Sequence, residues 1–240
     1  MNIGKFYGIG LGPGDPGLVT LKAAQTLRHV STIYSAASRQ TENSVSGAII
    51  AALGDVVAPV IELTFSMGLN WQERHQQVCD NATRIFTELE TGRDCAFVTI
   101  GDPLTYSTCG YLLKELRRMR SDLAWEIIPG VNSWSALAAT AGEVLAEDQT
   151  GLRIVPGYLA PNDAELETLL AGDDTLVLLK TYRSRNQLIA MLREKQRAFI
   201  YGANLGLVGQ FISDDADAIG RREPEYLSML LVPARPQEKK

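Results

Sequence analysis

A dense glycine stretch, YGIGLGPGDPGLVTLK at residues 7–22, directly follows an apolar run. Its glycines alternate along the chain at Gly8, Gly10, Gly12 and Gly14. Glycine lets a backbone come close to a bulky group. A tight strand-to-helix turn, capped by Asp15 and continued by Pro16, would need fewer of them. We therefore expect a bulky ligand to approach the end of this strand.

The chemistry of that ligand is constrained by what the stretch lacks. A phosphate-binding P-loop needs Lys and then Ser or Thr after its glycines, and this pair is absent here. A dinucleotide site needs G-x-G-x-x-G and an acidic residue about 20 residues later. This loop contains Pro13 instead, and the next strand ends in IYSAAS without an acid. A nicotinamide-dependent oxidoreductase therefore stays a remote alternative.

Three later strand ends also carry turn residues or polar side chains. They are VTIGDPLTYST at 98–108, IIPGVNSWSAL at 127–137 and LLKTY at 178–182. Ligands of open α/β sheets bind beyond the carboxyl ends of the strands. The first end offers Asp102 and a run of hydroxyls, and the second offers Asn132 and Ser133. Turn chemistry and helix capping, by Ser107 or Thr108 and by Asn132 and Ser133, is the structural alternative.

Residues that usually perform covalent or metal chemistry are scarce. The histidines are His29 and His75, and the three cysteines, Cys79, Cys95 and Cys109, lack C-x-x-C spacing. We therefore expect no metal site and no disulfide framework, as suits a reducing cytosol. A hydrolase with a His-activated nucleophile is disfavoured for the same reason.

The elements that position these residues alternate between strand and helix. Apolar, β-prone strands are expected at 5–11, 31–36, 94–100 and 125–130. Helical spacing of apolar residues predicts helices at 20–30, 44–53, 71–89, 109–120 and 133–142. This alternation predicts an α/β domain at 1–147 with a mainly parallel sheet and helices on both faces.

A second, smaller α/β domain is expected at 151–233. Its strands are predicted at 152–157, 175–180, 198–204 and in YLSMLLVPA, and its helices at 163–172 and 185–196. The acidic segment 213–225 precedes the last strand and favours an antiparallel finish over a crossover, which makes this sheet mixed. Residues 234–240 are expected to form a flexible tail.

Composition narrows the class of partner. The chain has 240 residues, of which 45% are hydrophobic and 21% charged, and a formal net charge of -5. An acidic chain is a poor non-specific partner for nucleic acid. The sequence contains no apolar stretch near the roughly 18 residues of a membrane span and no signal-peptide pattern at its start. We expect a cytoplasmic protein without a membrane partner.

Taken together, GIGLGPGDPGLVTLKA, IGDPLTYST and IIPGVNSWSA resemble the motifs of the tetrapyrrole methylases in order and in spacing. The resemblance covers nearly the whole chain, including TLVLLKTYR and YLSMLLV. It implies methyl transfer from S-adenosylmethionine, two α/β domains with an interdomain cleft, and a homodimer. GDPLTYSTCGYL and LAED are most similar to the precorrin-2 C20-methyltransferases of cobalamin biosynthesis, and slightly closer to those whose substrate carries cobalt.

Two departures from the family pattern bear on this assignment. Ser35 stands where the uroporphyrinogen methyltransferases of the family have an aspartate, which argues against the first methylations of the pathway. The segment YGANLG lacks the Glu-Asn or Glu-Arg pair that is common in relatives, which bears on the contacts of the second domain.

The resemblance also implies the site. Cofactor-binding positions are expected at Pro13, Gly101, Asp102, Thr105, Tyr106, Ser107, Thr108, Asn132 and Ser133, and more loosely at Lys180 and Leu205. Substrate-binding positions are expected at Gly12, Gly14, Asp15 and Arg183. The catalytic candidates are Asp102, as a base or (the role we favour) a cofactor ligand, and Tyr106, which would orient the substrate or relay a proton.

Methyl transfer from a sulfonium to carbon is an in-line displacement that needs alignment rather than a covalent nucleophile. The substrate carries many carboxylates, so the candidate anion-binding side chains are Arg39, Arg153, Arg183 and Arg185. Two alternatives stay open. One is a methylase of the same fold acting at another tetrapyrrole position or on protein or RNA, and the other is an inactive tetrapyrrole carrier.

Overall fold

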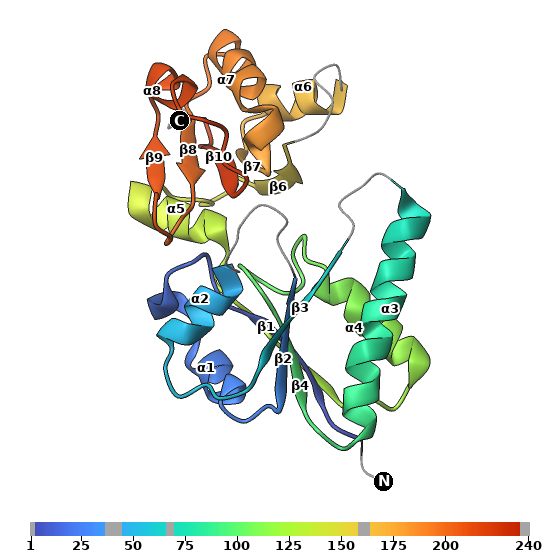
Figure 1. Ribbon diagram of the computed structural model, residues 1–240. Helices are drawn as coiled ribbons and strands as arrows, with labels where there is room; N and C mark the ends of the chain where they lie inside the picture. Colours follow the sequence, from blue (N-terminus) through green and yellow to red (C-terminus); the bar gives the residue numbers. More distant parts are fainter. Residues whose placement is uncertain (1–2, 37–44, 66–69, 158–163, 236–240) are drawn as a thin grey trace. The chain divides into compact units, whose positions relative to one another are not determined.

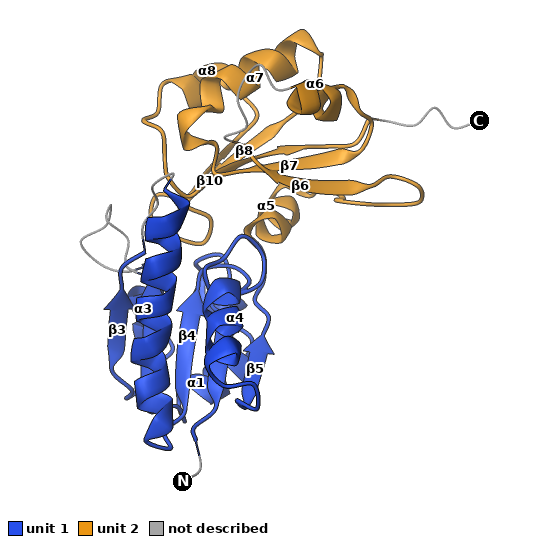
Figure 2. Cartoon of the chain, turned by 90° about the vertical axis from the view of Figure 1, so that its right-hand side faces the viewer, with its two compact units in different colours: residues 1–132 blue, residues 133–240 orange. Residues whose placement is uncertain are grey.

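The computed structural model describes residues 3–36, 45–65, 70–157 and 164–235 (Figure 1). The chain divides into two compact units, residues 1–132 and 133–240 (Figure 2). The expected boundary at 147–151 lies after helix α5 (Ser133–Ala141), whereas this division lies before it. Both units contain a sheet covered by helices, as expected for an α/β chain.

A parallel sheet forms the centre of the first unit. Its strands are β1 (Phe6–Gly10), β2 (Thr32–Ala36), β3 (Val60–Leu63), β4 (Cys95–Thr99) and β5 (Trp125–Ile128). They lie in the order β3-β2-β4-β1-β5, and every pairing is parallel. The predicted parallel sheet is confirmed. Strand β3 is an addition to it, because this partly exposed edge strand lacks a continuous apolar run.

Helices cover both faces of this sheet. They are α1 (Leu21–Leu27), α2 (Val45–Ala52), α3 (Trp71–Glu90) and α4 (Cys109–Met119). A single-turn helix, η1 (Pro16–Leu18), precedes them, and Asp15 Oδ1 accepts a hydrogen bond from Gly17 N at 2.8 Å. The predicted role of Asp15-Pro16 as the start of a turn is therefore confirmed.

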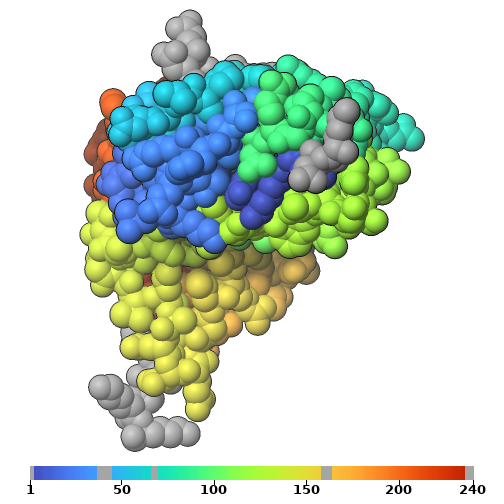
Figure 3. All heavy atoms as spheres, turned by 90° about the horizontal axis from the view of Figure 1, so that it is seen from below, coloured from blue at the N-terminus to red at the C-terminus, as the bar shows by residue number. Residues whose placement is uncertain are grey.

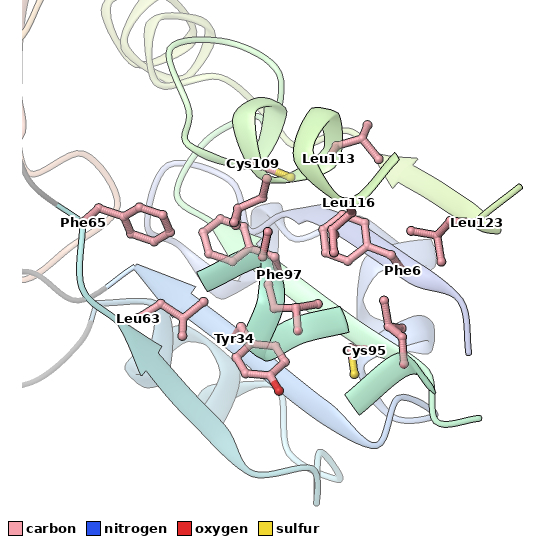
Figure 4. Close-up of a cluster of buried hydrophobic side chains, with 14 residues drawn as sticks. Phe6, Tyr34, Leu63, Phe65, Cys95, Phe97, Cys109, Leu113, Leu116 and Leu123 are labelled. Carbon is pink, nitrogen blue, oxygen red and sulfur yellow. The ribbon is translucent and has the colours of Figure 1, made fainter. Parts of the chain in front are cut away.

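Alternation along the strands sorts the core into two layers. On β4, Cys95 and Phe97 pack with α3 and α4, and Figure 4 shows this cluster. Ala96 and Val98 point the other way and pack with Leu27 of α1 and with α2. Both faces of the strand are buried, which explains why its sequence is a nearly continuous apolar run.

A mixed sheet forms the second unit. Its strands are β6 (Leu152–Pro156), β7 (Thr175–Leu179), β8 (Ile200–Ala203), β9 (Phe211–Ser213) and β10 (Ser228–Val232). Their order is β6-β7-β10-β8-β9, and β6 and β7 are parallel while the other pairs are antiparallel. The predicted antiparallel finish is confirmed, since β10 lies between β7 and β8.

Helices pack on both faces of this sheet. One face carries α6 (Ala164–Ala171), α7 (Arg185–Glu194) and α8 (Ala216–Gly220). The other face carries α5, whose Trp134 and Leu137 pack against Val177 of β7. A Cβ on Gly202 would lie 2.9 Å from Leu137 Cδ1, so that glycine makes room for α5. This packing explains why α5 belongs to the second unit.

The acidic segment between the last two expected strands contains more structure than its composition predicts. Helix α8 lies within it, and strand β9 ends at its first residue, Ser213. Asp215 accepts a hydrogen bond from Asp217 N at 2.8 Å and caps α8, and Ile219 is buried. One buried side chain and one cap anchor this short segment, and neither leaves an apolar pattern in the sequence.

Candidate active site

Three strand ends of the first unit meet backbone to backbone. The loops after β1 and β4 form an isolated antiparallel bridge, in which Gly101 N donates to Gly12 O at 2.7 Å and Gly12 N to Gly101 O at 3.4 Å. A Cβ placed on Gly10 would lie 2.5 Å from Gly101 O and 2.6 Å from Gly130 N. The glycines at the ends of β1, β4 and β5 therefore allow the three loops to touch.

This junction corrects part of the expectation for the glycine stretch. A Cβ on Gly8 would lie 2.6 Å from Cys109 Sγ and 2.5 Å from Ile127 Cδ1. Protein atoms therefore fill the space beside Gly8 and Gly10, and the assignment of these two glycines to ligand approach is wrong. A Cβ on Gly12, where φ is +76°, would meet Leu18 O at 3.1 Å.

Gly101 differs from the other glycines of the junction. Its φ is +73°, a conformation that L side chains rarely adopt, and a Cβ there would have no heavy atom within 4 Å. Open space therefore lies beside the backbone at the end of β4, which leaves room for a ligand. This is the position expected for cofactor binding, and its surroundings fit a group that approaches the main chain.

The carboxylate of Asp102 fastens the loop that follows Gly101. Oδ1 accepts hydrogen bonds from Leu104 N at 2.9 Å and from Thr105 Oγ1 at 3.3 Å. Oδ2 accepts a hydrogen bond from Gly130 N at 3.3 Å, which ties this loop to the end of β5. With both oxygens engaged by the protein, Asp102 is placed to hold the site in shape.

Tyr106 and its neighbours form the second half of the same loop. Tyr106 has φ +51° and is 48% exposed. Ser107 Oγ donates to Thr99 Oγ1 at 3.3 Å and accepts a hydrogen bond from Cys109 N at 3.2 Å. Ser107 therefore caps the start of α4, as the structural alternative predicts, and Thr108 makes no side-chain cap.

The remaining predicted positions of the first unit differ in exposure. Pro13 and Gly14 are buried in the loop after β1, whereas Asp15 is exposed. Asn132 lies at the end of the unit and, like Ser133, is half-buried. The bridge and Asp102 thus bring together the loops that carry Gly12, Gly101, Thr105 and Gly130.

In the second unit, Lys180 follows β7 in the left-handed conformation, with φ +59° and ψ +45°. Its N donates to Ser228 O at 3.0 Å, and burial lowers the pKa of its ammonium group. Asn204 follows β8 with φ +50°, and its N donates to Leu227 O at 2.9 Å. Lys180 and Asn204, both in the left-handed conformation, therefore lie on either side of the start of β10. Of the two, only Lys180 is a predicted cofactor-binding residue.

Leu205, the other position expected in this unit, is 5% exposed and packs in the core with Trp134 and Val177. Its side chain is therefore inaccessible, and only its backbone could take part in binding. The sequence does not predict the burial of Leu205, because a leucine that follows a strand is equally compatible with a hydrophobic core and with a binding site.

The four arginines that could bind carboxylates have different environments. Arg183 is exposed, with its guanidinium 5.2 Å from the ring centre of Tyr182. Arg153 pairs with Asp174 at 3.1 Å. Arg185 is 3% exposed and donates to Arg222 O at 2.8 Å, so it is a core residue. The fourth, Arg39, lies outside the described residues.

Two surface hollows lie away from the predicted positions. One, of about 220 Å³, is lined by Tyr7, Gln25, Thr26, His29, Val30 and Asp94. It lies toward the amino ends of β1 and β4, and Figure 3 views the molecule from that end of the sheet. The other, of about 400 Å³, is lined by Arg193, Phe199, Asp214, Asp215, Ala216 and Asp217. Neither contains a residue of the candidate site.

The described parts of the chain contain neither a cluster of metal-ligating side chains nor a membrane-spanning helix. In residues 3–36, 45–65, 70–157 and 164–235, no three His, Cys, Asp or Glu side chains are grouped so that they could hold a metal ion. Within the same ranges, every helix is too short or too polar to cross a bilayer.

Comparisons with known proteins agree with the fold. The sequence profile of the family described as Tetrapyrrole (Corrin/Porphyrin) Methylases matches residues 5–214. The chain is 31% identical over 192 residues to a cobalt-precorrin-2 C(20)-methyltransferase of Salmonella typhimurium, covering 80% of this chain and 78% of that protein. It is 30% identical over 236 residues to a probable cobalt-precorrin-2 C(20)-methyltransferase of Methanocaldococcus jannaschii, covering 95% of each.

A solved structure shares the architecture at lower sequence identity. It is a uroporphyrin-III C-methyl transferase from Thermus thermophilus in complex with S-adenosylhomocysteine. The TM-score is 0.66 at 20% identity, and the match covers 96% of this chain and 97% of that one. At this identity the likeness concerns the fold alone.

Proposed function

Because the chain belongs to the tetrapyrrole (corrin/porphyrin) methylase family, we propose that it transfers a methyl group from S-adenosylmethionine to C20 of precorrin-2 or cobalt-precorrin-2 in cobalamin biosynthesis. The observation that carries the proposal is the similarity to the Methanocaldococcus jannaschii relative, which spans 95% of both chains. The family profile matches residues 5–214, a range that contains the predicted site residues of both units.

The residues of the first unit suit the binding of such a donor. Bound S-adenosylmethionine would supply a methyl group activated by a positively charged sulfur. Gly101 and Thr105 would hold it beside the open space at the end of β4, with help from Pro13, Asn132 and Ser133. Asp102 keeps the loop in place through its hydrogen bonds to Leu104 N and Gly130 N. Such fixed loops favour alignment of the reacting groups, which is the main requirement of an in-line displacement.

The two buried cysteines of the first unit fit a reaction without a covalent nucleophile. Burial raises the pKa of both Cys95 and Cys109 to about 12, so neither is a thiolate at neutral pH. Tyr106 stays the candidate for orienting the substrate, and Gly12, Gly14, Asp15 and Arg183 stay the candidates for substrate contact. Lys180 and the backbone of Leu205 stay predictions for further cofactor contacts, as do the homodimer and the cytoplasmic location.

The experiment is an anaerobic assay of the purified chain with S-adenosylmethionine and either precorrin-2 or cobalt-precorrin-2. We expect mass spectrometry to detect the gain of one methyl group and NMR with an isotopically labelled methyl group to locate it at C20. The two substrates, compared at equal concentration, decide the metal state. A methyl group at another carbon would overturn the C20 assignment. Binding of either tetrapyrrole without transfer would point to a carrier.

A further inference from the structure

An exposed leucine and an exposed tyrosine stand out on the loop after β4. Leu104 is 59% exposed and Tyr106 is 48% exposed, although both lie between well-anchored residues. Leu104 Cδ2 would lie 3.9 Å from a Cβ on Gly110, so its side chain lies near the first turn of α4. The loop thus presents apolar surface at the carboxyl end of the sheet, next to the open space beside Gly101.

A hydrogen bond fixes the backbone of Leu104. Its amide donates to Asp102 Oδ1 at 2.9 Å, and Pro103, which precedes it, is buried. The backbone of Leu104 is therefore fixed while its side chain is exposed, which is the preorganisation expected of a ligand contact.

Tyr106 is held in a strained conformation by the residues on either side of it. A φ of +51° is uncommon for a non-glycine residue and persists only where the surroundings impose it. Thr105 Oγ1 donates to Asp102 Oδ1 and Ser107 Oγ donates to Thr99 Oγ1, each at 3.3 Å. Strain of this kind gathers at functional sites, where it fixes the direction of a side chain.

We propose that Leu104 and Tyr106 form a platform against which one face of the tetrapyrrole macrocycle packs. This inference rests on the proposed function and adds Leu104 as a substrate-binding residue. A macrocycle of this class has apolar faces and carboxylates around its edge. An aliphatic and an aromatic side chain fit the apolar face of such a macrocycle.

The test compares Leu104→Asp and Tyr106→Asn with the unchanged chain. Asparagine tolerates the left-handed conformation, so the second variant removes the ring while keeping the loop geometry. Val57→Ala is the control, since Val57 is 89% exposed and precedes β3, at the amino end of the same sheet. Three quantities are measured: the KM for the tetrapyrrole, its Kd from quenching of tryptophan fluorescence, and the Kd for S-adenosylhomocysteine from calorimetry.

We expect both variants to raise the KM and Kd for the tetrapyrrole by about tenfold or more. The Kd for S-adenosylhomocysteine should stay within about twofold of the unchanged chain, and Val57→Ala should change neither ligand's affinity. Unchanged tetrapyrrole affinity in both variants overturns the platform. So does an equal loss of affinity for both ligands, which would make the loop a general support.

Failure of the proposed function gives a different result. If the unchanged chain binds a tetrapyrrole but transfers no methyl group, the Kd comparison still tests the platform. Weaker binding by both variants then supports the platform while the methyltransferase proposal falls. If the unchanged chain binds neither precorrin-2 nor cobalt-precorrin-2, both ideas are overturned.

Discussion

The carboxylate of Asp102 accepts a hydrogen bond from the amide of Gly130, and this 3.3 Å contact joins the loop after β4 to the loop after β5. The same carboxylate also binds the amide of Leu104 and the hydroxyl of Thr105. One side chain therefore sets the relative position of two loops that carry predicted site residues. Loss of the Asp102 carboxylate should therefore disturb the geometry of the site more than it disturbs the overall fold.

Asp102→Asn tests this relation. The amide oxygen can replace one carboxylate oxygen, but the amide nitrogen would face another donor, Gly130 N. We expect the free energy of unfolding to fall by about 1–3 kcal/mol, measured by urea denaturation, and the affinity for S-adenosylhomocysteine to fall with it. Asp15→Asn is the matched control, because asparagine caps a turn as well as aspartate does. Equal losses in the two variants would contradict a special role for Asp102.

Gly130→Ala tests the backbone junction. A Cβ on Gly130 would collide with the carbonyl of Gly101 and lie 2.9 Å from Gly10 Cα. Backbone atoms yield less readily than side chains, so we expect a loss of about 3 kcal/mol or more and no measurable binding of S-adenosylhomocysteine. Gly220→Ala, where a Cβ meets nothing within 4 Å, should stay within about 1 kcal/mol. A Gly130→Ala variant with unchanged binding would show that the junction does not shape the site.

The glycines of the backbone junction show which part of the site the sequence does not predict. Continuous apolar runs and helical periodicity identify nearly every strand and helix of the first unit, because a strand buried on both faces and a helix buried on one face each leave a direct pattern. A glycine reveals only that a side chain is excluded at its position. Whether protein fills the space, as beside Gly10, or leaves it open, as beside Gly101, depends on contacts far apart in the chain.

The second unit shows a related limit. Helix α5 follows β5 in sequence, and the periodicity of its residues predicts the helix but not the sheet that it covers. Leu137 packs against Gly202, a residue 65 positions later in the chain (202 − 137). Asn204 was missed for a similar reason, because its left-handed conformation follows from the place where β8 ends beside β10. The local sequence pattern predicts which helices and strands form, whereas long-range packing decides to which unit each of them belongs.

Ser35→Ala should stabilise the protein. Ser35 is fully buried on β2, and among the described residues its Oγ is the buried side-chain oxygen without a hydrogen-bond partner. Replacing an unsatisfied hydroxyl by a methyl group should raise the free energy of unfolding by about 1 kcal/mol in urea denaturation. Ser107→Ala should have the opposite sign, since its hydroxyl bonds Thr99 and Cys109 N. A loss of stability in Ser35→Ala would indicate a partner for this hydroxyl.

Arg185 and Arg183 should respond differently to alanine. The guanidinium of Arg185 is buried, donates to the carbonyl of Arg222 at 2.8 Å and lies 3.8 Å from a carboxylate oxygen of Glu225. Its removal leaves these acceptors buried, so we expect Arg185→Ala to lose about 3 kcal/mol. Arg183→Ala, at an exposed position, should stay within about 0.5 kcal/mol and affect only substrate affinity. Similar thermal and urea midpoints for both variants would contradict this assignment.

Glu126 should make stability depend on pH in the acidic range. Hydrogen bonds from Lys22 and then Lys5 lower its pKa from the usual 4.5 to about 2 in the folded chain. A lowered folded pKa means that this contribution to stability is complete above about pH 4.5 and is lost as pH falls toward 2. We expect the stability difference between the unchanged chain and Glu126→Gln to shrink over that range in urea titrations. High salt should reduce this stability difference at neutral pH, because the ion pair between Lys5 and Glu126 is partly exposed. A difference independent of pH would mean that the two lysines do not hold this carboxylate.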